Sequence, residues 1–128
     1  MSKKIALIIG GSGGIGTAII KRLLREGFLV CGTYYKNADK VEILSQELNE
    51  QPVFFYKMDI LDKTAIQTTM KDILAELGPI DVLVFAATLP LEHKLLVDCE
   101  WGDFEKDLQV QLGGMFCAFK SLQAQIKQ

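Results

Sequence analysis

The sequence predicts an α/β fold, a doubly wound parallel sheet covered by helices on both faces. Short apolar runs rich in Val, Ile and Phe alternate with segments of helical periodicity along the chain, which is typical of parallel strands joined by crossover helices. The apolar runs show no polar alternation, as expected for strands buried on both faces. With 128 residues, 49% of them hydrophobic, the chain suits one domain, residues 1–128, with its own core.

Four apolar runs are the predicted strands. They are Lys4–Ile9, Phe28–Thr33, Val53–Met58 and Ile80–Ala87. Right-handed crossovers between them give the strand order 3-2-1-4 as the simplest doubly wound arrangement. The winding then reverses between the first and fourth strands, and ligands bind at such a switch point.

The first three helices are predicted from apolar residues at helical spacing. The first helix is assigned an apolar face of Ile15, Ile19, Leu23 and Leu24, and Gly27 ends it. The second is marked by Val41, Leu44 and Leu48 and ends before Pro52. The third begins after Asp62, a favourable N-cap residue, and ends at Gly78-Pro79.

The last predicted helix is the longest. Its apolar positions are Phe104, Leu108, Leu112, Met115, Phe116, Phe119, Leu122 and Ile126. Residues 88–103, which include Pro90, His93, Trp101 and Gly102, form the one long irregular connection. Long connections at the carboxyl ends of strands often shape sites.

Composition excludes several classes of function. The net charge of −2 argues against a nucleic-acid binder with a basic surface. The longest apolar runs, Ile5–Ile9 and Val82–Ala87, are far shorter than the roughly 20 residues that span a bilayer, so we expect no membrane partner. The start Met1-Ser2-Lys3-Lys4 is followed by a short apolar run and then glycines, unlike a signal peptide.

The three cysteines, Cys31, Cys99 and Cys117, are widely spaced and form no Cys-x-x-Cys pair. We expect buried, reduced thiols in a cytoplasmic protein. His93 is the single histidine, and we expect it to be a loop residue without a metal. The acidic residues before the last helix are more typical of compensation of the helix dipole than of a paired-acid active site.

A glycine-rich turn between the first strand and the first helix is the most informative segment. It reads Ile9-Gly10-Gly11-Ser12-Gly13-Gly14-Ile15-Gly16. Glycine permits positive φ in a tight turn and lets backbone and phosphate approach closely, while the free N–H groups of the helix start favour an anion. We therefore predict a nucleotide phosphate site. A Walker A loop is excluded because Thr17 stands where its lysine is required.

The end of the second strand bears on which nucleotide binds. Tyr34, Tyr35 and Lys36 follow this strand, and no carboxylate occurs before Asp39. NAD sites and methyltransferase sites usually have an acidic residue here for the ribose hydroxyls, whereas a nearby cation suits a ribose 2′-phosphate. We therefore favour NADP over NAD as the cofactor. A methyltransferase-like site is less easily dismissed than a Walker A loop.

At this point the chain resembles the short-chain dehydrogenase/reductase family, particularly its 3-oxoacyl-acyl-carrier-protein reductase type, over all 128 residues. Gly10-x-x-x-Gly14-Ile15-Gly16 is similar to the family's cofactor loop. The resemblance implies a Rossmann-type fold and an NAD(P)-dependent oxidoreductase acting on keto or hydroxy substrates, or on substrates of the 3-oxoacyl class. It also implies cofactor contacts from Ser12 and Gly13 of the loop.

The resemblance implies further cofactor contacts at the ends of later strands. Met58-Asp59-Ile60 resembles the pair whose carboxylate contacts the adenine amino group, although a strand-end or turn carboxylate is the plain alternative for Asp59. Asp81 to Thr88 is similar to Asp-x-Leu-Val-Asn-Asn-Ala-Gly, so Ala86, Ala87 and Thr88 are expected to line the cofactor cleft through their backbone. Phe85 and Ala86 replace both asparagines.

The chain departs from the family at the catalytic residues. Gln111 stands at the position of the catalytic asparagine, where a partly exposed helix residue is the alternative. None of Tyr34, Tyr35 and Tyr56 is followed by lysine four residues later. The family's Tyr-x-x-x-Lys pair follows the helix with which this chain ends. We therefore expect the first half of the fold, truncated before the fifth strand, with no catalytic residue of its own.

Two hypotheses follow. The chain is either the cofactor-binding portion of a reductase, inactive alone, or a non-catalytic nucleotide-binding or protein-interaction module. In both cases we expect self-association through the unpaired edge of the fourth strand or the uncovered apolar face of the last helix, or another cover for that edge, because such surfaces promote association.

Overall fold

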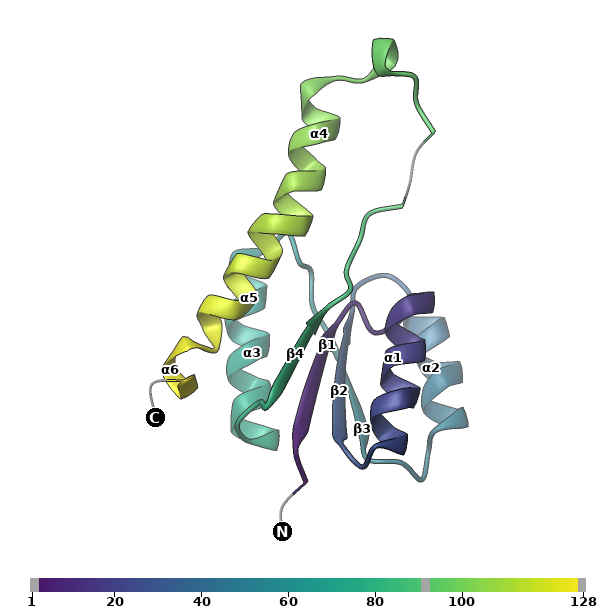
Figure 1. Ribbon diagram of the computed structural model, residues 1–128, viewed down its shortest axis with the longest axis vertical. Coiled ribbons are helices and arrows are strands. Elements are labelled where there is room, and N and C mark those ends of the chain that lie inside the picture. Colours follow the sequence, from purple (N-terminus) through teal and green to yellow (C-terminus); the bar gives the residue numbers. More distant parts are fainter. Residues whose placement is uncertain (1–2, 91–92, 127–128) are drawn as a thin grey trace.

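The computed structural model describes residues 3–90 and 93–126. Its four strands form one parallel sheet in the order β3-β2-β1-β4, which confirms the predicted topology (Figure 1). The strands are β1 (Ile5–Ile9), β2 (Leu29–Tyr34), β3 (Val53–Lys57) and β4 (Val82–Phe85). Within the described residues, β3 and β4 are therefore the two edges of the sheet.

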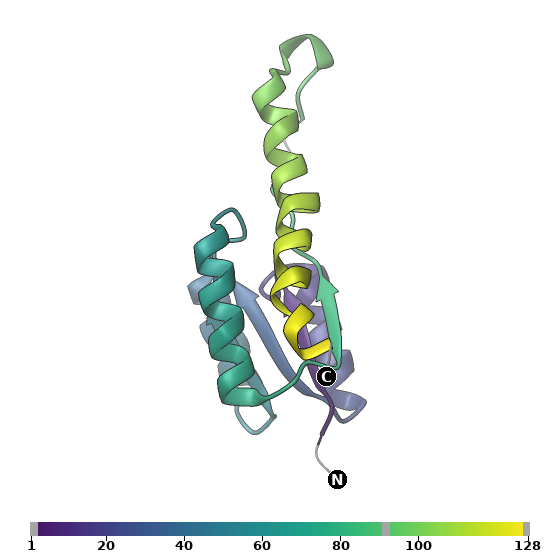
Figure 2. The same ribbon diagram turned by 90° about the vertical axis from the view of Figure 1, so that its left-hand side faces the viewer.

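Helices cover both faces of the sheet (Figures 1 and 2). On one face lie α1 (Gly14–Arg25) and α2 (Ala38–Glu47). On the other lie α3 (Lys63–Leu77) and α5 (Met115–Ser121), which contact each other. α4 (Trp101–Leu108) extends beyond the carboxyl edge of the sheet, and α6 (Gln123–Ile126) follows α5.

Local sequence signals account for the end of α1 and for both ends of α3. Gly27 has a φ of +87° and follows the last turn of α1, as predicted from its position. Asp62 caps α3, since its carboxylate accepts a hydrogen bond of 3.1 Å from the N–H of Ala65. Gly78, with a φ of +103°, ends that helix.

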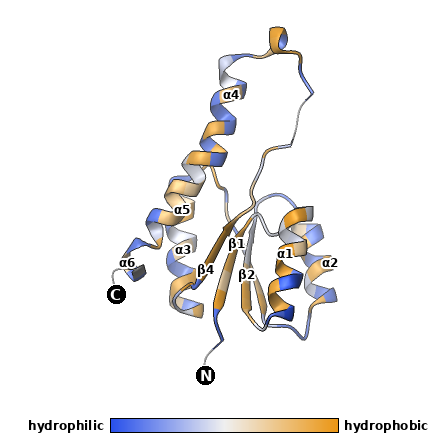
Figure 3. Cartoon of the chain, in the orientation of Figure 1, coloured by the Kyte–Doolittle hydropathy of each residue, from blue (hydrophilic) through white to orange (hydrophobic). Residues whose placement is uncertain are grey.

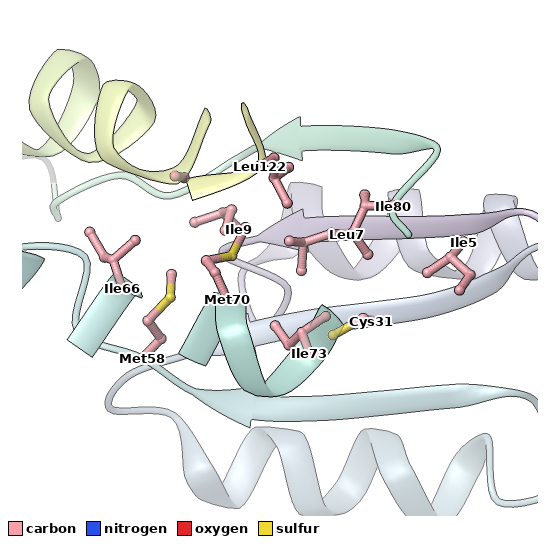
Figure 4. Packing of buried hydrophobic residues seen from close by; sticks show 11 residues of the cluster. Ile5, Leu7, Ile9, Cys31, Met58, Ile66, Met70, Ile73, Ile80 and Leu122 are labelled. Atoms are coloured by element: carbon pink, nitrogen blue, oxygen red, sulfur yellow. The ribbon is translucent and has the colours of Figure 1, made fainter. Parts of the chain in front are cut away.

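The core lies on both sides of β1, all of whose residues are buried. The larger cluster, shown in part in Figure 4, packs β1 and β2 against α3 and the last helical segment; its labelled residues are Ile5, Leu7, Ile9, Cys31, Met58, Ile66, Met70, Ile73, Ile80 and Leu122. The smaller cluster includes Ile20 of α1. The edge strands β3 and β4 are only partly buried, because each has one neighbour.

The predicted apolar face of the first helix was partly wrong. Ile15 is 74% exposed, whereas Gly16 and Ile20 are buried. The reason is the close approach of Gly16 to the turn before the helix. A Cβ at Gly16 would overlap the carbonyl oxygen of Gly10 and lie 3.0 Å from Gly11 Cα, so the face through Gly16 and Ile20 turns to the sheet and Ile15 turns away.

The last helix also differs from the prediction. It begins at Trp101, three residues before the expected start, and a short 3₁₀ turn at Leu96–Asp98 interrupts the connection that was expected to be irregular. Asp103 explains the early start, because its carboxylate accepts the N–H of Glu100 at 3.0 Å. The helix is not uniform either, since residues 109–114 form a π-helical stretch.

The expectation of an uncovered apolar face on this helix is confirmed. Leu112 is 58% and Phe116 63% exposed, and orange residues recur along α4 and α5 in Figure 3. Other exposed apolar side chains of this face are Phe104, Leu108, Met115 and Phe119. β4 is also an edge strand: within the described residues it pairs with β1 on one side, and its other side is unpaired.

β4 is shorter than the predicted run Ile80–Ala87, although backbone bonds continue past both of its ends. The N–H groups of Asp81 and Ala86 donate to the carbonyls of Ile5 and Ile9 at 2.8 and 2.7 Å. Ahead of β4, the side-chain amide of Gln125 accepts from the N–H of Ile80 at 3.0 Å and donates to its carbonyl at 2.8 Å. This pair attaches the last helical segment to the sheet.

The expectation of three buried thiols was only partly right. Cys31 is buried, Cys117 is partly buried and Cys99 is exposed, and all three are unpaired. Cys99 lies in the connection before α4, where its thiol donates to the carbonyl of Leu95 at 3.4 Å. None of the described helices has the length and apolar character needed to cross a bilayer.

Candidate functional site

A cavity of about 380 Å³ opens at the carboxyl ends of the strands, where the sheet order changes direction. Parallel registers such as Ile9 with Thr33 and Ile9 with Phe85 bring these ends to one edge. The lining residues include Gly10, Ser12, Gly13, Tyr34, Tyr35, Lys36, Asp59, Ile60, Ala86, Ala87 and Thr88. Eleven of the predicted contact residues thus surround one space, and Gly14, Ile15 and Gly16 are the beginning of α1 beside it.

The glycine-rich turn forms one wall of this cavity. Gly10 has a φ of +89°, and a Cβ there would lie 2.6 Å from the nitrogen of Ala87. Its conformation and its neighbour both exclude larger residues. Gly14 differs, because a Cβ there meets nothing within 4 Å. The fold itself therefore requires Gly10 and Gly16, whereas Gly14 leaves open space at the start of α1.

Thr33 holds this turn in place and was missed as a site residue. Its side chain is 2% exposed, and its hydroxyl accepts the N–H of Gly10 at 3.3 Å while its carbonyl accepts the N–H of Gly11 at 2.8 Å. The hydroxyl of Thr17 donates to the carbonyl of Gly11 at 3.2 Å. A threonine at the end of an otherwise apolar strand, next to a glycine turn, is the signal that could have identified it.

The start of α1 presents free backbone donors. Its N-cap residue is Gly13, which has no side chain to cap the helix, and no acidic residue stands in the first turn. The first N–H groups of a helix have no intrahelical acceptor, so those of Gly14, Ile15 and Gly16 are available to a ligand. Together with the helix dipole they favour an anion at this point.

The end of β2 contributes the cationic wall. Lys36 lines the cavity, and its ammonium lies 5.6 Å from the ring centroid of Tyr35. Asn37, which the sequence analysis did not single out, also lines it and donates to the hydroxyl of Ser12 at 3.5 Å. Asp39 lies in the first turn of α2 and is not among the lining residues, as expected from its position.

The end of β3 contributes Asp59 and Ile60. The Asp59 carboxylate accepts the N–H of Leu61 at 3.0 Å, so it forms the turn that was the plain alternative for this residue, and it lines the cavity as well. Ile60 lies under the π-helical stretch, since a Cβ at Gly114 would be 2.5 Å from its Cγ1. This contact sets how the last helix stands over the cavity.

The end of β4, the helix α4 and the π-helical stretch that follows it complete the walls. Phe85 packs against the core while Ala86, Ala87 and Thr88 line the cavity. Gln111 is exposed and is not a lining residue, which matches its plain alternative. Lys106 and Val110 line the cavity instead; sequence reasoning missed them because periodicity does not tell which side of an extended helix faces a site.

The residues with shifted pKa values lie outside this cavity. Burial, with a smaller effect of Glu76, raises the pKa of the Cys31 thiol to about 12. Burial and then the hydrogen bond donated to Glu76 raise the pKa of the Tyr56 phenol. The N–H of Glu100 and the ammonium of Lys94 hold the pKa of Asp103 below its ordinary value. Cys31 and Tyr56 belong to the core or pack against it, and Asp103 caps the start of α4.

His93 is exposed in the connection before α4, as expected. Within residues 3–90 and 93–126, no cluster of histidine, cysteine and acidic side chains has the arrangement of a metal site. The lining of the cavity offers backbone N–H groups, two lysines, several hydroxyls and the carboxylate of Asp59. Such a set is suited to a phosphate-bearing organic ligand.

Comparison with known proteins adds the family. The family model described as "short chain dehydrogenase" matches residues 4–128. An acetoacetyl-CoA reductase of Paracoccus denitrificans is 40% identical over 116 residues, covering 88% of this chain and 45% of that protein. A 3-oxoacyl-acyl-carrier-protein reductase of Staphylococcus aureus is 28% identical over 98% of this chain and 52% of its own length. The chain thus spans about half the length of these curated relatives.

Solved structures agree with the fold. A dehydrogenase/reductase from Sinorhizobium meliloti superposes with a TM-score of 0.88 at 29% identity, covering 97% of this chain and 50% of that one. A blue fluorescent protein from a metagenomic library, solved in complex with NADPH, has a TM-score of 0.82 at 30% identity and covers 94% and 50%.

Proposed function

The chain belongs to the short-chain dehydrogenase family, and on that premise we propose that its cavity binds a nicotinamide dinucleotide, NADP in preference to NAD. The observation that carries the proposal is the start of α1, where free N–H groups lie beside a turn that only glycine can form. A pyrophosphate between the two nucleosides fits these donors.

The remaining walls suit the other parts of the cofactor. We assign the ribose phosphate to Tyr34, Tyr35 and Lys36 at the end of β2, and the adenine to Asp59 and Ile60 after β3. β2 and β3 are neighbouring strands, and all five residues line the cavity. The nicotinamide end is assigned to the last three predicted contacts, Ala86, Ala87 and Thr88. Lys36 and the lack of a carboxylate after β2 favour the extra phosphate of NADP, and a relative of similar fold was solved with NADPH.

The reaction that we infer for the whole protein is reduction of a keto group, with 3-oxoacyl thioesters as the substrate class that the names of its relatives suggest. The nicotinamide would supply the hydride. The 128 residues contain no Tyr-x-x-x-Lys pair, so we propose that this chain by itself binds the cofactor without reducing a substrate. Oxidation of NADPH by the purified chain in the presence of acetoacetyl-CoA would contradict this proposal.

The test of cofactor binding is a calorimetric titration of the folded chain with NADPH and NADH. Gly14→Asp places a carboxylate where a Cβ meets nothing within 4 Å and where the helix dipole stabilises it, so the fold should persist while the phosphate is repelled. We expect at least a tenfold loss, about 1.4 kcal/mol. Ala18→Asp adds the same charge one turn further along α1 and serves as the control. NADPH binding that is unchanged in Gly14→Asp would refute the site.

A second candidate function is that of an interaction module that pairs with a second copy of itself. The exposed apolar face of α4 and α5 favours it. Asp103, Glu105 and Asp107 give the start of the last helix a net negative charge in spite of Lys106, and Lys120 lies near the end of α5. Antiparallel pairing about a twofold axis would bring the net negative start of this helix in one copy near Lys120 of the other.

Sedimentation velocity tests this pairing. We expect a dimer for the wild type and a monomer for Phe116→Asp, which charges the exposed face. Ile43→Asp changes an equally exposed apolar residue on α2, on the opposite side of the sheet, and should leave the dimer intact. A monodisperse wild-type monomer at high concentration would contradict self-association.

The unpaired cysteines suit a reducing compartment, so we also propose a cytoplasmic location.

A further inference from the structure

The cavity receives a second lysine from the helix α4. Lys106 lines it together with Val110, one turn further along. Lys36 enters from the connection between β2 and α2, a helix on the α1 side of the sheet, whereas α4 leads into α5 on the α3 side. The two lysines therefore approach the same space from opposite layers of helices.

Two contacts relate the segments that carry these lysines to β3 and its end. The helix that carries Lys106 is set over the end of β3 by the contact of Gly114 with Ile60. β3 pairs with β2, whose carboxyl end leads to Lys36. The helix that carries Lys106 and the strand that leads to Lys36 therefore both adjoin β3 or its end, and both lysines line the one cavity.

Neither ammonium is neutralised within the described residues. The nearest acidic residue on the preceding turn of α4, Asp103, is bound to Lys94 at 3.1 Å and to the N–H of Glu100 at 3.0 Å. No ion pair joins Lys106 or Lys36 to a carboxylate in this part of the chain. The lining has one carboxylate, that of Asp59, against two lysines, although the whole chain carries a net charge of −2. The cavity is locally cationic.

We propose that Lys106 is a specificity-determining residue that, with Lys36, holds the phosphate monoester on the adenosine ribose of NADP. This inference rests on the proposed cofactor function. The backbone donors of α1 do not distinguish NADP from NAD, because both carry the pyrophosphate. A ribose phosphate monoester carries close to two negative charges at neutral pH, and two cations from opposite walls match it. Lysine suits this role as a point charge on a long flexible stem.

The experiment compares Lys106→Gln, Lys36→Gln and the wild type by calorimetric titration with NADPH and NADH, and with 2′,5′-ADP and 5′-ADP as probes. Lys71→Gln is the matched control, because Lys71 is exposed on α3 and does not line this cavity. We expect Lys106→Gln to weaken NADPH and 2′,5′-ADP about tenfold, the scale of one hydrogen bond to a charged group. NADH and 5′-ADP should change less than about twofold, and the salt dependence of NADPH binding should decrease.

The outcomes separate the two proposals. If the wild type binds NADPH and Lys106→Gln binds it equally well, or loses NADPH and NADH to the same degree, the role of Lys106 is refuted and the cofactor site stands. If the folded wild type binds neither dinucleotide, both proposals fail. Thermal unfolding of Lys106→Gln should match the wild type, because the side chain is exposed.

Discussion

Replacing Gly114 with alanine tests whether the close contact between the last helix and the cavity wall stabilises the fold. A Cβ at Gly114 would lie 2.5 Å from Cγ1 and 3.1 Å from Cδ1 of Ile60. Carbon atoms pack at about 3.5–4.0 Å, so the helix or Ile60 must move by about 1 Å. Overpacking of this kind costs about 2 kcal/mol, and the better helix propensity of alanine offsets up to about 1 kcal/mol.

Gly113→Ala provides the matched control. A Cβ at Gly113 meets nothing within 4 Å, so this variant has the gain in helix propensity without the clash. Urea unfolding followed by circular dichroism should show Gly114→Ala about 2 kcal/mol less stable than Gly113→Ala. Equal free energies of unfolding in the two variants would refute the contact as a source of stability.

The same pair of variants links packing to the cavity. Ile60 lines the cavity, so any movement that relieves the clash changes the wall at the end of β3. We expect NADPH to bind more weakly to Gly114→Ala and unchanged to Gly113→Ala. Weaker binding in both variants would mean that the effect does not pass through Ile60.

Three further predictions concern the rest of the molecule. Thr33→Val removes the hydroxyl that accepts the N–H of Gly10. It should lower the free energy of unfolding by about 1 kcal/mol, a low value because the hydrogen bond is long. Thr33→Ser keeps the hydroxyl and should stay near the wild type; an equal loss of stability in Thr33→Ser would contradict the role of this hydrogen bond. Because burial raises the pKa of Cys31 from 9.0 to about 12, the unfolded chain loses this proton first as pH rises, so stability should fall above about pH 9 by up to about 1.4 kcal/mol per pH unit; urea unfolding should show a shallower decrease in Cys31→Ala. Gln125→Ala removes two hydrogen bonds to Ile80 and should cost about 1–3 kcal/mol, whereas an unchanged urea midpoint would show that this attachment contributes nothing.

The order of strands and helices followed from periodicity alone. β1 is an uninterrupted apolar run buried on both faces, and its neighbours alternate with helices whose ends carry Asp62, Gly27 and Gly78. These signals are local, since capping and glycine conformation depend on a few consecutive residues. They predicted the sheet order because right-handed crossovers leave few alternatives.

The site was predictable where it was continuous in the sequence. The turn from Gly10 to Gly16 and the strand-end residues Tyr34 to Lys36 were identified from their place after strands, because parallel strands bring their carboxyl ends to one edge. Ile15 was misplaced, since periodicity does not show that Gly16 rests on Gly10. That contact, between backbone atoms six residues apart, rotates the start of α1.

The sequence by itself determined the α/β class, the parallel topology and the place of the glycine-rich turn between β1 and α1. Each of these depends on local pattern and on the few ways in which strands and helices can be connected. Only the tertiary structure decided that Thr33 fixes the turn and that Lys106 lines the same cavity as Lys36. It also decided that the apolar face of α4 and α5 stays uncovered. These three features depend on which surfaces meet in the folded chain. Contacts between residues far apart in the sequence cannot be read from its periodicity.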